Sequence, residues 1–153
     1  MNIRYAETDH DIIAIHRFLC VVMGPTLPGR IDHKDSATEV WRVVKEDVAL
    51  MAIDGDALVG TIGLVRPAWW WNTKITFLAN RWLACLPGTK ALLPLMREAR
   101  AIAKASELEL HIFDENEGRL LIFNKNEKRH VLRINPAIDD ANLADADAAV
   151  VAH

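Results

Sequence analysis

Apolar residues in the first third of the chain recur every three or four positions, which is the spacing of one helix face. This spacing covers two runs, residues 12–22 and 40–44, and a short strand is expected before them at residues 3–6. Each run follows a Ser/Thr-x-x-acid pattern, in which side chains and backbone N–H groups at a helix start bond one another. The two patterns are Thr8-x-x-Asp11 and Ser36-x-x-Glu39. We therefore expect two helices that begin at these capping boxes.

The middle of the chain changes to a strand pattern. Two apolar, β-branched runs, residues 48–53 and 57–65, lie on either side of Asp54-Gly55. An Asp-Gly pair between two such runs is typical of a tight antiparallel hairpin. Gly60 and Gly63 inside the second run predict a bulge or the close approach of another part of the backbone. A further strand is expected at about residues 75–86.

The second half of the chain alternates between the two patterns. A helix is expected after Gly88, a strand at 107–113, a short helix at about 119–125 and a last strand near 130–134. The order β-α-α-β-β-β-α-β-α-β predicts one α/β (α+β) domain with a mixed central sheet of about six strands and helices on both faces. We expect this domain to span residues 1–138. The Ala- and Asp-rich residues 139–153 are expected to be a surface helix or a disordered tail.

Composition narrows the function classes. Hydrophobic residues make up 51% and charged residues 25% of the chain, an ordinary balance for a soluble globular domain. The net charge of -3 lacks the basic excess of nucleic-acid-binding proteins, so no nucleic acid partner is expected. There is no apolar run of about twenty residues that would span a membrane, and no secretion signal at the N-terminus. A cytoplasmic protein is the expectation.

Cysteine and histidine spacing favours neither a disulfide nor a metal site. Cys20 and Cys85 are far apart, without a Cys-x-x-Cys pair. His10 and His16 are six positions apart, which places them on different helix faces. Reduced thiols and no metal site are therefore expected.

The stretch "WLACLPGTKALLPLMREARAIAKA", residues 82–105, carries the strongest chemical signal. It predicts an apolar strand, a tight turn and an amphipathic helix. The free N–H groups and positive dipole end of a helix start suit a pyrophosphate, and Lys90 adds a positive charge. A plain strand-to-helix connection is the alternative, since Pro87-Gly88 would serve it equally well.

This order of elements resembles the GNAT superfamily of acyl-CoA-dependent N-acetyltransferases. The opening "IRYAETDHDIIAIHRFL" and the hairpin "MAIDGDALVGTIGLV" are similar to those of the family, and "ELHIFDENEGRLLIF" places Asn116 seven residues before Phe123, the family's Asn-to-Tyr spacing. The turn departs from the family pattern R/Q-x-x-G-x-G/A. Pro87 stands at the usual Arg and Gly88 matches the next glycine, but Lys90 and Leu92 stand where small residues are usual. The shortened turn and "RPAWWWNTKITFL" resemble divergent GNAT-like proteins of phages and prophages.

The resemblance implies a cofactor, acetyl-CoA or another acyl-CoA, and acyl transfer to an amine of a small molecule or a protein. It implies cofactor contacts along the fourth strand, in the turn and after the fifth strand. These residues are Trp82, Leu83, Ala84, Gly88, Thr89, Lys90, Ala91 and Asn116. Asn116 is equally suited to be a helix N-cap.

Catalytic groups are sparse. The resemblance implies an acid at Phe123, which cannot donate a proton, and a base on the fourth strand, where Asn80 and Arg81 offer no carboxylate. His111 is the remaining candidate base, because a strand histidine next to the cleft could accept the proton of the amine. The alternative is a histidine that is only hydrogen-bonded in place.

The Trp69-Trp70-Trp71 run is the most unusual local feature. Alternation along an extended segment points Trp70 away from the other two, so at least one indole is expected near solvent. The run could line an acceptor pocket, form a homodimer contact or cover the sheet edge as core. The missing acid and carboxylate base leave a second hypothesis open, a catalytically inactive structural or interaction protein with this fold and a phage origin.

Overall fold

The computed structural model describes residues 1–114, 118–124 and 129–133. Among these residues the helices are α1 (Asp9–Val22), α2 (His33–Glu46) and α3 (Leu92–Ala105), with a 3₁₀ turn η1 at Gly24–Thr26. Seven strands form the main sheet, in the order β1 (Asn2–Tyr5), β2 (Val48–Asp54), β3 (Ala57–Val65), β6 (Leu78–Cys85), β7 (Leu110–Asp114), β8 (Arg119–Phe123) and β9 (Arg129–Arg133). A separate two-stranded sheet consists of β4 (Ala68–Trp69) and β5 (Asn72–Thr76). Asn116 and the predicted tail 139–153 lie outside the described residues.

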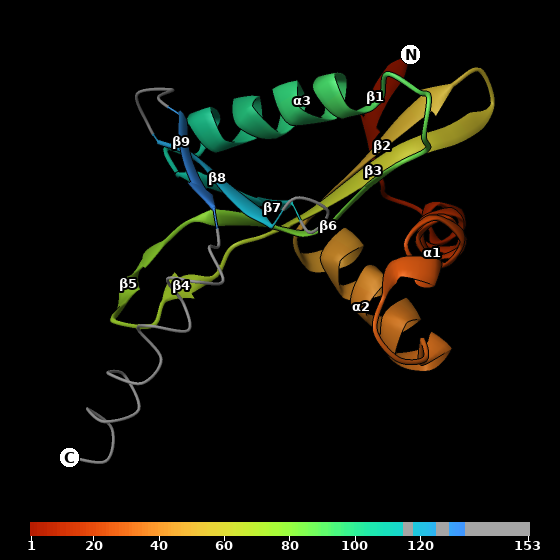
Figure 1. Cartoon of the computed structure of the whole chain (residues 1–153), viewed down its shortest axis with the longest axis horizontal. Coiled ribbons are helices and arrows are strands. Elements are labelled where there is room, and N and C mark those ends of the chain that lie inside the picture. Colours follow the sequence, from red (N-terminus) through yellow and green to blue (C-terminus); the bar gives the residue numbers. More distant parts are fainter. Residues whose placement is uncertain (115–117, 125–128, 134–153) are drawn as a thin grey trace.

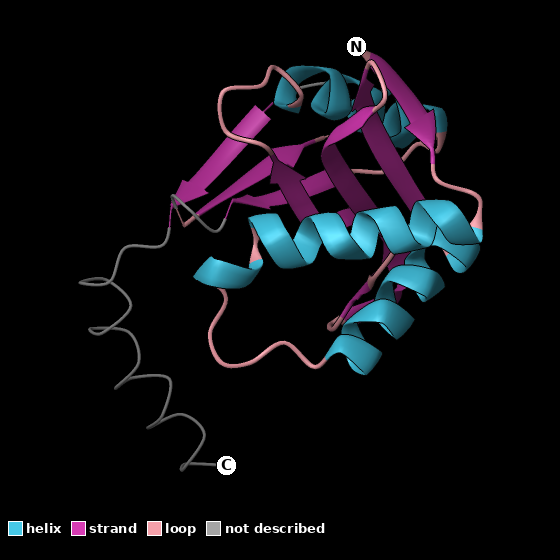
Figure 2. Cartoon of the chain, turned by 90° about the vertical axis from the view of Figure 1, so that its right-hand side faces the viewer, coloured by secondary structure: helices cyan, strands magenta, loops and turns pink. Residues whose placement is uncertain are grey.

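The helices lie on both faces of the main sheet. Figure 1 shows α3 along one face and α1 and α2 on the other, and Figure 2 shows the same layers from the side. All neighbouring strands of the sheet are antiparallel except β6 and β7, which are parallel. The predicted α/β class, with a mixed sheet and helices on both faces, is therefore confirmed. The described sheet has seven strands where about six were expected.

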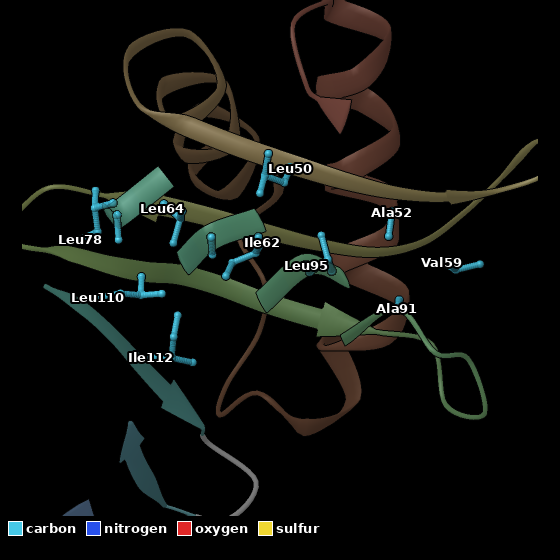
Figure 3. Close-up of a cluster of buried hydrophobic side chains, with 12 residues drawn as sticks. Leu50, Ala52, Val59, Ile62, Leu64, Leu78, Ala91, Leu95, Leu110 and Ile112 are labelled. Carbon is cyan, nitrogen blue, oxygen red and sulfur yellow. The ribbon is translucent and has the colours of Figure 1, made fainter. Parts of the chain in front are cut away.

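Apolar side chains are buried on both faces of the main sheet, so each face has its own hydrophobic core under the helices that cover it. On the α3 side the buried side chains include Leu50, Ile62, Leu64, Leu95 and Leu110, as Figure 3 shows. On the other side α1 and α2 cover a second cluster, which is made of Ala6, Ile12, Ile15, Val40, Val43, Val44, Ala49, Met51 and Trp82. Because adjacent strand residues point to opposite faces, the same strands contribute to both cores.

The predicted capping box of α1 is confirmed, and that of α2 is wrong. The Thr8 hydroxyl accepts a hydrogen bond from the Asp11 N–H at 3.1 Å, and the Asp11 carboxylate accepts one from the Thr8 N–H at 3.2 Å. Helix α2 begins earlier than predicted, because the Asp32 carboxylate accepts from the Asp35 N–H at 3.0 Å and caps the helix. An Asp cap is at least as favourable as a Ser cap, and the earlier start adds a turn of helix. Ser36 therefore lies inside α2.

Two other predicted elements differ from the structure. Residues 119–123 form strand β8, which pairs antiparallel with β7, and not the expected short helix. The sequence Leu-Leu-Ile-Phe has no polar face for a surface helix and suits a strand that lies between two neighbours. The strand expected at about 75–86 is interrupted at Phe77, since β5 pairs with β4 and β6 alone joins the main sheet.

Candidate functional site

The parallel strands β6 and β7 pair only at their first residues. In the described sheet the paired positions are Leu78 with Leu110 and Ala79 with His111. Both strands continue beyond these positions without pairing each other, and their arrows diverge in Figure 3. The gap between β6 and β7 beyond Ala79 and His111 is called the splay below.

A bulge in β6 lies where the splay begins. Gly63 of β3 pairs with Trp82, and the next residue, Leu64, pairs with Asn80. Arg81 is therefore an extra residue in β6 that has no opposite partner in β3. A bulge of this kind bends its strand and increases the local twist. We infer that the bulge turns β6 away from β7.

Side chains hold the bulge from both sides. The Asn80 amide donates to the Phe113 carbonyl at 3.1 Å, and its oxygen accepts from the Phe113 N–H at 2.8 Å. On the β6 side of β7, strand pairing ends at His111. Asn80 therefore provides the hydrogen-bond partners of the Phe113 N–H and carbonyl groups on that side. The Arg81 guanidinium donates to the Glu39 carboxylate of α2 at 3.0 Å. From the sequence, Asn80 and Arg81 were notable only because neither is a carboxylate that could act as a base. Their hydrogen bonds depend on strand register, which the sequence does not show.

After β6 the chain makes the predicted tight turn. The Leu86 carbonyl accepts hydrogen bonds from the Thr89 N–H at 3.2 Å and from the Thr89 hydroxyl at 2.6 Å. Gly88 has a φ of +79°, and Pro87 precedes it. Proline followed by a glycine of positive φ is the pattern of a type II turn. Gly88 and Lys90 are exposed, so the turn presents its outer side to solvent.

The start of α3 lies directly on the sheet after this turn. Ala91 is its N-cap, and among the described residues no side chain caps the helix. The N–H groups of Leu92 and Leu93 are in the first turn, where a helix offers them no partner of its own. A Cβ at Gly60 would lie 2.8 Å from the Ala91 Cβ, so only glycine permits this contact. Of the two alternatives predicted at Gly60, the bulge is present, because Val59 next to it is an extra residue opposite β2. The atoms close to Gly60 belong to side chains and not to the backbone.

Three of the predicted cofactor contacts, Trp82, Leu83 and Ala84, lie on β6. Their side chains are largely packed in the two cores, so mainly their backbone is left to face the splay. Trp82 is 6% exposed, and its indole N–H donates to the Thr61 hydroxyl at 3.1 Å. The indole covers Gly63, where a Cβ would lie 2.6 Å from the ring. Ala84 is buried, and the half-buried Leu83 packs against the core on the α3 side.

His111 lies at the closed end of the splay and is buried. Its ring packs on Phe77 with centroids 4.4 Å apart and on Trp69 at 5.2 Å. Its Nε2 is 3.6 Å from the Glu109 carboxylate, which is beyond hydrogen-bond distance. Burial lowers the pKa of His111, although Glu109 opposes this effect. The imidazole is therefore neutral at pH 7, the form that can accept a proton.

The tryptophan run forms a hairpin beside His111. Trp69 is half-buried, and its ring stacks on that of Trp71 with centroids 4.3 Å apart. The Phe77 ring packs on Trp69 at a tilt, with centroids 4.4 Å apart. Trp70 is 86% exposed and Trp71 is 59% exposed. The expectation that at least one of these indoles lies near solvent is confirmed.

An open groove of about 1010 Å³ runs beside α3, from its first turn toward β8. Apolar and basic side chains line it, among them Leu92, Leu93, Met96, Arg97, Arg100 and Phe123. Arg100 lies over the Phe123 ring, 4.7 Å from its centroid. Phe123 is thus a strand residue that faces α3, and not the residue of a following helix.

No helix in the part of the chain that the structure describes has the length and apolar character needed to cross a bilayer. Neither a family model nor any curated protein matches the sequence.

Solved structures do share its fold. A GNAT family acetyltransferase from Brucella melitensis in complex with acetyl-CoA is 17% identical, with 88% of each chain covered and a TM-score of 0.60. An aminoglycoside 6'-acetyltransferase type Ii is 19% identical, with 73% of this chain and 70% of that chain covered and a TM-score of 0.54. An aminoglycoside 6'-N-acetyltransferase complexed with coenzyme A is 20% identical, with 78% and 66% covered and a TM-score of 0.55. The chain therefore has the fold of GNAT acetyltransferases.

Proposed function

We propose that this chain is an acyl-CoA-dependent N-acyltransferase that transfers an acetyl group to the amine of a small molecule or a protein. The observation that carries the proposal is the splay between β6 and β7, which opens next to the uncapped start of α3. Support comes from the fold, which is shared with acetyltransferases solved with acetyl-CoA and with coenzyme A.

In this proposal the extended arm of the cofactor lies in the splay. The backbone of Trp82, Leu83 and Ala84 lies beyond the last pair with β7, so it can bond an extended amide chain as a neighbouring strand would. Asn116 would contact the same arm.

The pyrophosphate lies at the turn and the first turn of α3. Backbone N–H groups of Gly88 and Ala91 would hold it, together with those of Leu92 and Leu93 at the helix start. Thr89 would act by closing the turn, because its N–H and its hydroxyl both donate to the Leu86 carbonyl. The exposed Lys90 adds a positive charge. The groove beside α3, with Arg97 and Arg100, offers room for the nucleotide end.

Bound acetyl-CoA would supply the activated acyl group, and the protein would mainly position the two substrates. Neutral His111 is the candidate to accept the amine proton at Nε2. This atom is buried and has no hydrogen-bond partner among the described residues, so the Trp69 and Phe77 side chains that pack on the ring would have to move for an amine to reach it. Phe123 has no proton to give, so the departing thiolate would take its proton from solvent. We propose a cytoplasmic location and a phage origin from the sequence alone.

Calorimetric titration with acetyl-CoA tests this function. The wild-type chain should bind one equivalent. Gly88→Asp places a carboxylate in the turn and should weaken binding about tenfold, the effect of roughly 1.4 kcal/mol of charge repulsion. Gly88→Asn is the matched control, since Asn and Asp both tolerate a positive φ and differ mainly in charge. It should bind within about twofold of wild type. No heat with acetyl-CoA or with longer acyl-CoA esters would remove the proposal.

The exposed indoles of Trp70 and Trp71 favour a second candidate, an inactive interaction protein that forms a homodimer through this hairpin. Light scattering after size-exclusion chromatography should then give a dimer mass for wild type and a monomer mass for the Trp70→Ser, Trp71→Ser variant, without acetyl-CoA binding. Trp41→Ser replaces a tryptophan of α2 that is 48% exposed and should leave the dimer intact. A wild-type monomer at all concentrations would eliminate this candidate.

A further inference from the structure

We infer that α1 and α2 together form a Zn²⁺ site whose protein ligands are His16, Cys20 and His33. The three side chains meet between the last turns of α1 and the first residue of α2. They belong to the helix layer opposite α3, so the inference does not depend on the proposed acyltransferase function.

The distances between the donor atoms fit one metal ion. The Cys20 Sγ is 3.6 Å from the His16 Nε2 and 3.8 Å from the His33 Nδ1. Tetrahedral zinc, with Zn–S bonds of about 2.3 Å and Zn–N bonds of about 2.0 Å, separates sulfur and nitrogen ligands by roughly 3.6 Å. All three donor atoms lie within 4.8 Å of one another. His33 is exposed, so its ring has room to move toward His16.

The fold explains why these residues meet. His16 and Cys20 are four positions apart on α1, the spacing that places two side chains on one helix face. His33 is the first residue of α2 and arrives from a different element. A metal bound by all three would tie the end of α1 to the start of α2. The expectation of no metal site rested on the His10–His16 spacing and the lack of a Cys-x-x-Cys pair, and the His16-x-x-x-Cys20 spacing did not enter it.

The ligand chemistry suits zinc. A thiolate with two imidazoles is a ligand set that zinc accepts, and three protein ligands leave its fourth position for water or another small ligand. The His16 Nε2 is 2.8 Å from the Ser36 hydroxyl. A metal on this nitrogen would displace that hydrogen bond, and the hydroxyl could then bond a water in the fourth position. The alternative is ordinary packing, in which the His16–Ser36 bond simply joins the two helices.

Cobalt substitution distinguishes the two, because a Co²⁺–thiolate bond gives a charge-transfer band in the near ultraviolet. The full chain without a tag, kept reduced, should bind one equivalent of Co²⁺ with this band and lose the band when Zn²⁺ is added. Cys20→Ser should abolish the band. His33→Ala, at an exposed position, should weaken binding at least about tenfold, since even residues behind the ligands commonly matter that much.

Matched controls come from the same chain. Cys85→Ser removes the other thiol, and His10→Ala removes an exposed histidine of α1, and both should bind like wild type. Circular dichroism checks that each variant is folded, and Zn²⁺ should raise the melting temperature of wild type but not that of Cys20→Ser. Co²⁺ binding without a thiolate band, or an unchanged band in Cys20→Ser, would overturn the inference.

Discussion

Individual polar side chains fix the backbone around the splay where the sheet does not. Asn80 bonds Phe113 on one side of the bulge, and Arg81 reaches Glu39 on the other. The Glu39 carboxylate also accepts from Arg42 at 2.6 Å. Hydrogen bonds from Arg42, and then from Arg81, lower the pKa of Glu39 to about 2. The bulge is therefore tied to α2 through one ionised carboxylate.

Glu39→Gln tests this tie through its dependence on pH. The pKa of Glu39 is lower in the folded chain than its ordinary value, so its contribution is fully present above about pH 4.5 and is lost as the pH falls toward 2. Because about a third of the side chain is exposed, we expect a loss of about 1 kcal/mol at pH 7. The free energy of unfolding in urea, measured for both chains at several pH values, should show the difference shrinking in acid.

Glu46→Gln, at an exposed position of the same helix, is the control and should behave like wild type. A difference between Glu39→Gln and wild type that stays constant down to pH 2 would show that the carboxylate charge is not what holds the bulge.

At the scale of elements, the sequence correctly predicted the features that depend only on residues close together along the chain. The hairpin around Asp54-Gly55 and the capping box of α1 are local signals, and both are present. The start of α2 was wrong because two capping residues, Asp32 and Ser36, compete within one turn. Residues 119–123 were mistaken for a helix, because a short apolar run has no clear period and β7 decides its conformation.

In the candidate site, too, the local features could be predicted from the sequence, and the features that depend on distant residues could not. The turn at Gly88 and the bulge next to Gly60 follow from glycine placed between or within regular elements. The bulge at Arg81 depends on how β6 registers with β3, and the bond of Asn80 depends on β7, which is 33 residues away along the chain. A single sequence contains no direct signal for either, so the origin of the splay came only from the structure.

At the scale of the whole molecule, the sheet separates two chemically different layers. The α3 side has the turn, the helix start and the groove lined by Arg97 and Arg100. The α1 and α2 side has the His16, Cys20 and His33 cluster and the ion pairs of Glu39. Ligands of the two proposed sites can thus be studied separately in one chain.

Backbone amide NMR of the ¹⁵N-labelled chain, titrated with acetyl-CoA, tests most directly whether the cofactor lies in the splay. The largest shift changes should fall on residues 81–86 of β6, residues 88–93 at the turn and start of α3, and Phe113 and Asp114 of β7. Residues 9–22 of α1 should change little, because they lie on the opposite layer. Saturable changes confined to the hairpin of Trp69 and Trp71, or no saturable changes at all, would contradict a cofactor site between β6 and β7.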